Sequence, residues 1–164
     1  MAGRRFIPYP AWSPTSPLVN PSLELPLSPP AFDWHVPSVE GVDSLRGVPP
    51  SGIKFAFSGH QPESAELLYQ ALFLLGGRAW TLSFEYQTRG IAPAQSGLFW
   101  NLSAAGDSPP LHPSEEWSSF SVSWTMPPQD SLRRLALIFR RPPGQVRTDG
   151  ELYIRGLRLE AARR

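Results

Sequence analysis

The sequence predicts an all-β fold, an antiparallel β-sandwich of eight or nine strands. Three observations favour this class. The 164 residues include 20 Pro and 13 Gly, and because proline disrupts helix interiors, that punctuation excludes a helical bundle. Six Trp and nine Phe supply more apolar surface than a disordered chain carries. From residue 31 onward, apolar and polar residues alternate between turn signals, which is typical of half-buried strands.

The first element is a lead-in. Residues 1–18 are rich in proline and are expected to be extended, whereas residues 19–162 are expected to form one sandwich domain. Pro14 and Pro17 form a PxxP motif that would suit an SH3-like partner. A lone motif of this kind is far more often an ordinary linker. Tyr9 and Trp12 are expected to hold the lead-in against the domain.

Eight segments of alternating character predict the strands of the domain. They are residues 32–36, 53–57, 67–75, 80–87, 98–102, 119–126, 135–140 and 152–159. Most have one apolar face, so that two sheets can bury a shared core. Four tryptophans fall on such faces and are expected in the core: Trp34, Trp80, Trp100 and Trp124. The last segment is interrupted by Gly156, which predicts a bulge or bend.

Residues 67–75 are the ambiguous segment. The preceding Ser64 could cap a helix, but the segment ends at Gly76-Gly77-Arg78, directly before a clear strand. We therefore expect a strand over 68–74, joined to the next strand by a short hairpin. Because both of its faces are apolar, it is expected to be a central strand.

Charge and composition exclude several classes of partner. The net charge is +1, too balanced for a nucleic-acid binder, which would carry a basic stripe. The chain has no cysteine, so it has no disulfide framework and no cysteine zinc site. No apolar run approaches a membrane span, and prolines interrupt the N-terminus before a signal-peptide core can form. The protein is expected to be either cytoplasmic or a piece of a longer chain whose export signal lies upstream.

The order of several motifs resembles a known family. Residues 20–24 read NPSLE, similar to the NGSFE opening of galactose-binding-like jelly rolls. Three later segments resemble parts of that family in the same order. Its hairpin is similar to residues 68–86, its strand that begins with Trp and ends with Pro is similar to residues 117–127, and its closing strand is similar to residues 150–159. The family includes carbohydrate-binding modules of families four, nine and twenty-two. The segments FDW at 32–34 and RGIAP at 89–93 also resemble modules at the C-terminal end of bacterial tetratricopeptide-repeat proteins, some of them linked to exopolysaccharide systems.

The resemblance implies a jelly roll that acts as a non-catalytic carbohydrate-binding module. The expected partners of the module are a polysaccharide and the other domains of a longer parent chain. If the chain is a fragment of an exported protein, the resemblance favours the periplasm or the cell surface as its location. Many such modules hold a structural calcium with an acidic pair in the final strand. Here Arg155 and Gly156 take those places, so no family-type calcium site, and no other metal or cofactor, is expected. Glu24 is expected to face an arginine instead.

Seven residues are candidates for ligand binding on the concave sheet. A sugar site combines aromatic rings with amides, carboxylates and arginines. The candidates are Gln70, Glu85, Gln87, Phe99, Asn101, Arg140 and Tyr153. Each could equally belong to the ordinary solvated face of a sheet, and Arg140 could pair with Glu85. The alternative function is a structural or protein-interaction domain without a glycan ligand.

Enzymatic signals are weak. Asp33 and His35 could share a strand face but no third ligand accompanies them, and the adjacent pair Glu115 and Glu116 is poorly arranged for a glycosidase. The chain contains no G-x-S-x-G, HExxH, P-loop or GxGxxG motif. We therefore expect no catalytic residues. A glycan-active enzyme would require two distant carboxylates to converge in a cleft.

Overall fold

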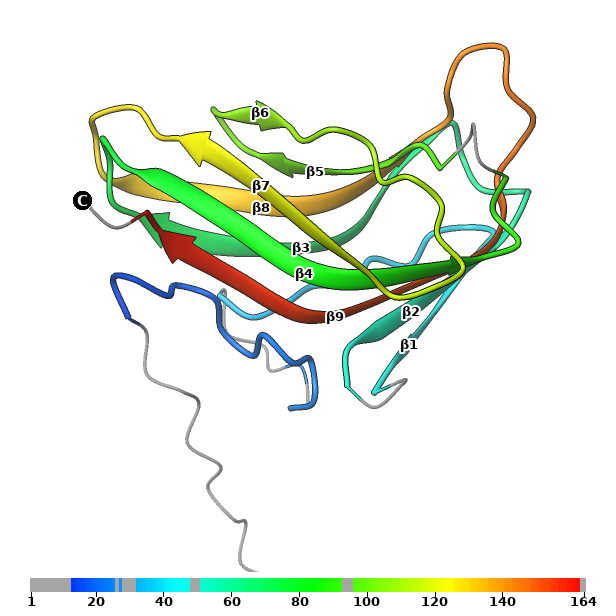
Figure 1. Ribbon diagram of the computed structural model, residues 1–164, viewed down its shortest axis with the longest axis horizontal. Helices are drawn as coiled ribbons and strands as arrows, with labels where there is room; N and C mark the ends of the chain where they lie inside the picture. Colours follow the sequence, from blue (N-terminus) through cyan, green and yellow to red (C-terminus); the bar gives the residue numbers. More distant parts are fainter. Residues whose placement is uncertain (1–12, 26, 28–31, 48–50, 93–95, 163–164) are drawn as a thin grey trace, which may run out of the picture.

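Nine strands in two antiparallel sheets make up the fold, in a computed structural model that describes residues 13–25, 27, 32–47, 51–92 and 96–162. The strands are β1 (Val42–Arg46), β2 (Ile53–Ser58), β3 (Ser64–Leu74), β4 (Ala79–Arg89), β5 (Leu98–Leu102), β6 (Gly106–Asp107), β7 (Ser118–Thr125), β8 (Ser131–Arg140) and β9 (Asp149–Ala161). One sheet has the order β1-β2-β9-β4-β7 and the other β3-β8-β5-β6. Figure 1 shows the long strands running lengthwise through the molecule. No described residue is helical, and so no described segment forms a helix able to cross a membrane. The predicted all-β sandwich is confirmed.

The core lies between the two sheets and is built from the apolar strand faces. The four tryptophans expected there are buried: Trp34, Trp80, Trp100 and Trp124. Trp100 of β5 contacts the opposite sheet, because its ring centroid lies 5.7 Å from that of Phe84 on β4. It also lies 6.3 Å from the ring centroid of Trp34, in the segment before β1. Aromatic pairs at these separations stabilise a core beyond their buried area.

The expected bulge in the final strand is confirmed. Gly156 adopts φ +66°, a conformation that glycine reaches without strain. The register of β9 against β4 shifts between Ser83 and Glu85, opposite this glycine. Leu157 and Leu159 return to the core after the bulge.

The expected hairpin after residue 74 is wrong. β3 belongs to the four-stranded sheet and β4 to the five-stranded sheet, so the chain crosses between layers at Gly76 and Gly77. The Gly76 amide donates to the Asp130 carboxylate (2.7 Å) and the Gly77 amide to the Pro127 carbonyl (2.9 Å). These bonds fix the crossing against the β7–β8 turn.

β3 is also an edge strand rather than a central one. Apolar residues fall on both of its predicted faces because the strand contains a bulge. The register against β8 shifts between Glu66 and Leu68, so that the consecutive residues Leu67 and Leu68 are both buried. Part of its free edge is covered by His35. The His35 amide donates to the Tyr69 carbonyl (2.8 Å), and the Tyr69 amide donates back to His35 (3.0 Å).

The strand expected over residues 32–36 does not form. The bridge between His35 and Tyr69 is the one β-pairing in that segment. Trp34 is buried, whereas Phe32 is 50% exposed, so the two residues do not share a face. The Trp34 indole donates to the Asn20 carbonyl (3.1 Å), and its amide donates to the Asp33 carboxylate (2.7 Å). These local bonds favour a turn over a continuous strand.

The described part of the lead-in packs on the sandwich, as the blue segment below β9 in Figure 1 shows. Leu18 and Leu23 are buried in the core, and the Ala161 amide at the end of β9 donates to the Thr15 carbonyl (3.4 Å). Tyr9 and Trp12 lie outside the described residues.

Candidate ligand-binding site

The seven candidate residues fall in three different places. Gln70 lies between the sheets. Phe99, Asn101 and Arg140 lie on the outer face of the four-stranded sheet, the face turned away from the other sheet. The remaining three lie on the outer face of the five-stranded sheet: Glu85, Gln87 and Tyr153. The assignments follow from strand parity, because neighbours of each candidate point into the core.

The expectation for Gln70 is corrected by its surroundings. Its side chain is 0% exposed, so a polysaccharide cannot reach it. The Gln70 Nε2 donates to the Val19 carbonyl (2.8 Å), and the Val19 amide donates to the Gln70 Oε1 (3.0 Å). Gln70 therefore anchors the chain that enters the domain.

The three candidates on the four-stranded sheet are connected through Asp107 of β6. The Asn101 amide nitrogen donates to the Asp107 carboxylate (2.6 Å), and the other carboxylate oxygen lies 3.6 Å from the Arg140 guanidinium. That guanidinium lies over the Phe99 ring, 4.8 Å from its centroid. β5 pairs with both β6 and β8, which brings these residues together. Arg140 and Asp107 remain well exposed, at 58% and 44% of their side-chain surface.

A second polar group on the same face was missed from the sequence. Arg134 of β8 makes a two-pronged ion pair with Glu66 of β3, with one bond of 3.0 Å. This hydrogen bonding raises the pKa of the Arg134 guanidinium. Arg134 shares strand parity with Arg140, so the alternation of β8 could have revealed it. Asp107 carried no such signal, because it sits in a strand of two residues.

Tyr69 on this face is covered by the protein itself. The His35 imidazole stacks on its ring at 4.7 Å with an interplanar angle of 9°, and the Arg134 guanidinium lies 3.5 Å from the same centroid. Two planar groups this close would overlap if they shared one side, so they cover opposite sides of the ring. The Tyr69 ring therefore packs against other side chains of the protein and offers no free face on which a sugar could stack.

The candidates on the five-stranded sheet are engaged with close partners. The Arg155 Nε donates to Glu85 (2.9 Å), and the Arg155 guanidinium lies 3.8 Å from the Trp117 ring centroid. Gln87 donates to the Glu115 carbonyl. Arg140 does not pair with Glu85 as considered above, because the two residues belong to different sheets.

Tyr153 belongs to a small charged cluster on that face. Its hydroxyl donates to Glu151 (2.7 Å), which also pairs with Lys54 (2.6 Å). The hydrogen bond from Lys54, with that from Tyr153, lowers the pKa of Glu151, and the bond to Glu151 raises the pKa of Tyr153. The Tyr153 hydroxyl is thus bonded to the Glu151 carboxylate, and the Tyr153 side chain is itself buried, with 5% of its surface exposed.

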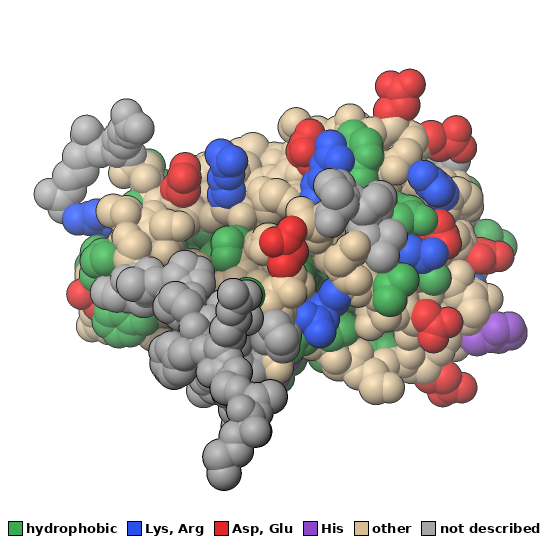
Figure 2. All heavy atoms as spheres, turned by 90° about the horizontal axis from the view of Figure 1, so that it is seen from below, with side chains coloured by type: hydrophobic (Ala, Val, Ile, Leu, Met, Phe, Trp, Pro, Cys, Tyr) green, Lys and Arg blue, Asp and Glu red, His purple; other side chains and the backbone are tan. Residues whose placement is uncertain are grey.

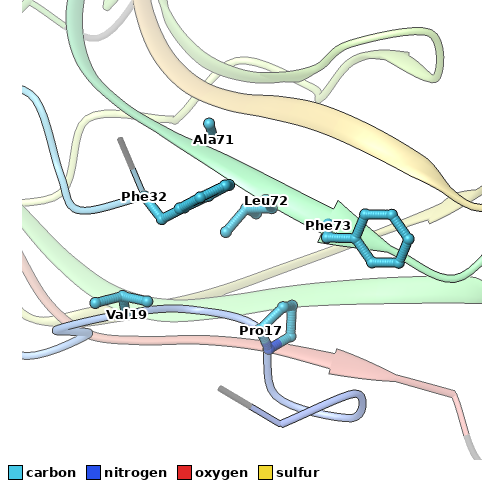
Figure 3. Close-up of a pocket in the computed structure, with 6 residues that line it drawn as sticks. All are labelled: Pro17, Val19, Phe32, Ala71, Leu72 and Phe73. Atoms are coloured by element: carbon cyan, nitrogen blue, oxygen red, sulfur yellow. The ribbon is translucent and has the colours of Figure 1, made fainter. Parts of the chain in front are cut away.

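Two of the surface hollows lined by described residues differ in chemistry. A polar hollow of about 360 Å³ lies above Gly156, between β4, β7 and β9, and includes Glu85 and Arg158 in its lining. An apolar hollow of about 350 Å³ lies between the lead-in and β3. Figure 3 shows its lining of Pro17, Val19, Phe32, Ala71, Leu72 and Phe73. None of these six residues has the side-chain donors and acceptors that sugar hydroxyls need.

Charge and possible metal ligands are dispersed. In the side shown by Figure 2, acidic and basic side chains are interspersed. No group of three or more His, Cys, Asp or Glu side chains able to hold a metal occurs within the described ranges. Arg155, which stands where the resemblance would put a calcium ligand, pairs with Glu85. Arg46 donates to the carbonyls of Leu23 and Leu25, on either side of Glu24, at 3.4 and 2.9 Å.

The fold is similar to that of several solved structures. No protein-family model and no curated protein matches the chain. Among solved structures, a family 4 carbohydrate-binding module is similar with a TM-score of 0.65 and 11% identity, over 88% of this chain and 99% of the module. A family 16 carbohydrate-binding module is similar with a TM-score of 0.56 and 14% identity, over 87% and 97%. The Stig cyclase Fisc from Fischerella sp. TAU is similar with a TM-score of 0.55 and 14% identity, over 92% and 98%. The chain therefore has the jelly-roll fold of carbohydrate-binding modules, a fold that a cyclase shares.

Proposed function

We propose that this chain is a non-catalytic module that binds a polysaccharide on the outer face of its four-stranded sheet. The carrying observation is the connected set of Phe99, Asn101, Asp107 and Arg140 on three neighbouring strands. Amide, carboxylate and guanidinium groups are the planar donors and acceptors that fix sugar hydroxyls. The Phe99 ring is only 6% exposed and lies under the Arg140 guanidinium, so it can contact the apolar side of a pyranose only when Arg140 moves off it. The jelly-roll likeness to carbohydrate-binding modules supports the same function.

A weak ion pair favours this face over the other one, where Arg155 and Glu85 are held at 2.9 Å. The Arg140–Asp107 pair spans 3.6 Å between two exposed side chains, and pairs of this kind contribute only about 0–1 kcal/mol. Arg140 can therefore leave Asp107 and swing off Phe99 at small cost when a sugar replaces both contacts. Glu85, Gln87 and Tyr153 lie on the opposite side of the sandwich, so one straight chain cannot contact both sets.

The spacing of carboxylates supports binding without hydrolysis. Glu66 and Asp107 stand on β3 and β6, at opposite edges of the four-stranded sheet. Three strand spacings separate them, roughly 14 Å. Glycosidase carboxylates lie about 5–9.5 Å apart. Each of the two is also paired with an arginine.

The parent protein of this module is proposed from the resemblance alone. The resemblance to modules of bacterial tetratricopeptide-repeat proteins supports a place in a larger surface or periplasmic protein linked to exopolysaccharide. Its partners would then be the polysaccharide and the parent protein's other domains, with no cofactor required.

A second candidate function is a protein-interaction domain. It is favoured by the apolar hollow of Figure 3 and by the exposed Phe73, which pairs across the sheet with the exposed Leu132. Exposed apolar patches of this kind often mark protein contacts. In this case no glycan is bound, and Leu132→Ser is expected to abolish capture of the partner protein.

Affinity electrophoresis tests the lead function. The protein is run through native gels that contain a soluble β-glucan, xylan or acidic exopolysaccharide, and retardation in at least one is expected. Asn101→Ala and Arg140→Ala are each expected to weaken binding about tenfold, because each removes direct hydrogen bonds to the glycan.

The matched control is Glu85→Ala, an exposed polar residue on the opposite face, which is expected to leave retardation unchanged. Absence of retardation in every gel, or a loss confined to Glu85→Ala, would overturn the proposal.

A further inference from the structure

We infer that β7 is a self-association edge at which two copies of this chain pair antiparallel and join their five-stranded sheets into one. β7 is the last strand of its sheet, with β4 on one side and no described strand on the other. Its pairing with β4 is regular over eight residue pairs, from Ala79↔Thr125 to Tyr86↔Ser118. Such an edge presents a row of backbone donors and acceptors that another strand can take up.

The other three sheet edges are protected. β1 has only five residues, two of them charged (Asp43 and Arg46). β6 has two residues. β3 is interrupted by its bulge and is bonded on its free side to His35. Short length, charge, bulges and a covering segment are the devices by which proteins prevent edge pairing.

Within the described part of the chain, β7 has none of these protective features. Its sequence is SSFSVSWT, without a charged residue, proline or glycine. Phe120 and Val122 are only half-buried at this edge, so apolar surface remains for a partner to cover. The acidic pair Glu115–Glu116 and the prolines Pro127–Pro128 stand just outside the strand and limit pairing to these eight residues.

The side chains favour a second copy and one register. With Val122 on the two-fold axis, Val122 faces itself and Phe120 faces Trp124, so that apolar residues meet on the inner side. On the outer side Ser121 faces Ser123 and Ser119 faces Thr125, which pairs hydroxyl with hydroxyl. Such cross-strand pairs are stabilising. Glu116 falls opposite Pro128 rather than another acid, so the strand meets itself without charge repulsion.

If the proposed function holds, this symmetry places the two glycan-binding faces of the dimer on one side. The two-fold axis that relates neighbouring antiparallel strands is perpendicular to the sheet. Both four-stranded sheets then lie on the same side of the joined sheet, and their outer faces point the same way. Two sites that face one way can hold one polysaccharide or surface with greater avidity than a single site.

Sedimentation velocity of the full chain without any polysaccharide tests the association. A dimer is expected to build up between about 1 and 100 µM, the range of a modest interface. Ser119→Lys with Ser121→Lys places charges on the edge and is expected to give a monomer with unchanged far-UV circular dichroism. The matched control, Ser44→Lys on the exposed edge strand β1, is expected to remain dimeric.

The cysteine-free chain also allows a test of register. An equal mixture of Ser121→Cys and Ser123→Cys proteins is expected to form a disulfide-linked dimer on mild oxidation, and each variant alone much less. A wild type that stays monomeric throughout, or a lysine pair that leaves the dimer intact, would overturn the inference. Cross-linking of Ser121→Cys alone, without cross-linking in the mixture, would overturn the register. None of these outcomes depends on glycan binding.

Discussion

Trp100→Ala is expected to lower the free energy of unfolding by about 3–5 kcal/mol, the range for removing a large aromatic side chain from a core. Trp100 is 0% exposed and contacts Trp34 and Phe84 at the meeting of the two sheets. A domain of this size is stabilised by only about 5–15 kcal/mol. Urea unfolding followed by far-UV circular dichroism measures the change.

Two controls separate packing from other effects. The Trp100 indole nitrogen has no hydrogen-bond partner among the described residues, so Trp100→Phe removes no bond and is expected to cost clearly less than alanine. Trp117 is half-buried at the sheet edge. Its replacement by alanine is expected to lower the free energy of unfolding by at most about 1 kcal/mol. An equal loss for Trp117→Ala and Trp100→Ala would contradict this account of the core.

Gln70→Leu is expected to destabilise the protein by about 2–3 kcal/mol, although leucine is similar in volume and more apolar. The change leaves the Val19 amide and carbonyl without their partners, and an unsatisfied buried polar group costs about 1–3 kcal/mol. The lead-in is also expected to loosen from the sandwich, which faster proteolysis or hydrogen exchange around residues 13–19 would report.

The comparison variant is Gln87→Leu. Gln87 also bonds a backbone carbonyl, but it is half-buried on an outer face, where water can replace the lost bond. Its expected loss is below about 1 kcal/mol. If Gln70→Leu kept full stability and the same protease resistance, Gln70 would not be the anchor described above.

The strands predicted from the sequence are those with a clear alternation. Residues 80–87, 98–102 and 135–140 all lie in strands with the expected core faces, because burial of one face requires period two. β1 and β6 are short and exposed, so no such pattern marks them. The Gly76–Gly77 turn fits both a hairpin and a crossing between sheets, and only the distant contacts with Pro127 and Asp130 decide between them.

The site was only partly predictable, for a related reason. Alternation tells which residues of a strand share a face, but not which sheet the strand joins. The candidates were therefore divided between two opposite surfaces. Gln70 shares its face with Leu68, Leu72 and Leu74, and that parity was the available signal that it would be buried. The same alternation placed Tyr69 on the outer face.

A backbone-amide NMR titration tests the central claim most directly. The labelled protein is titrated with a soluble fragment of the polysaccharide that retards it in gels. We expect chemical-shift changes concentrated at the amides of Phe99, Asn101, Asp107 and Arg140, with the amide signals of Glu85, Gln87 and Tyr153 unchanged. Shifts confined to the five-stranded face, or no shifts at saturating glycan, would contradict it.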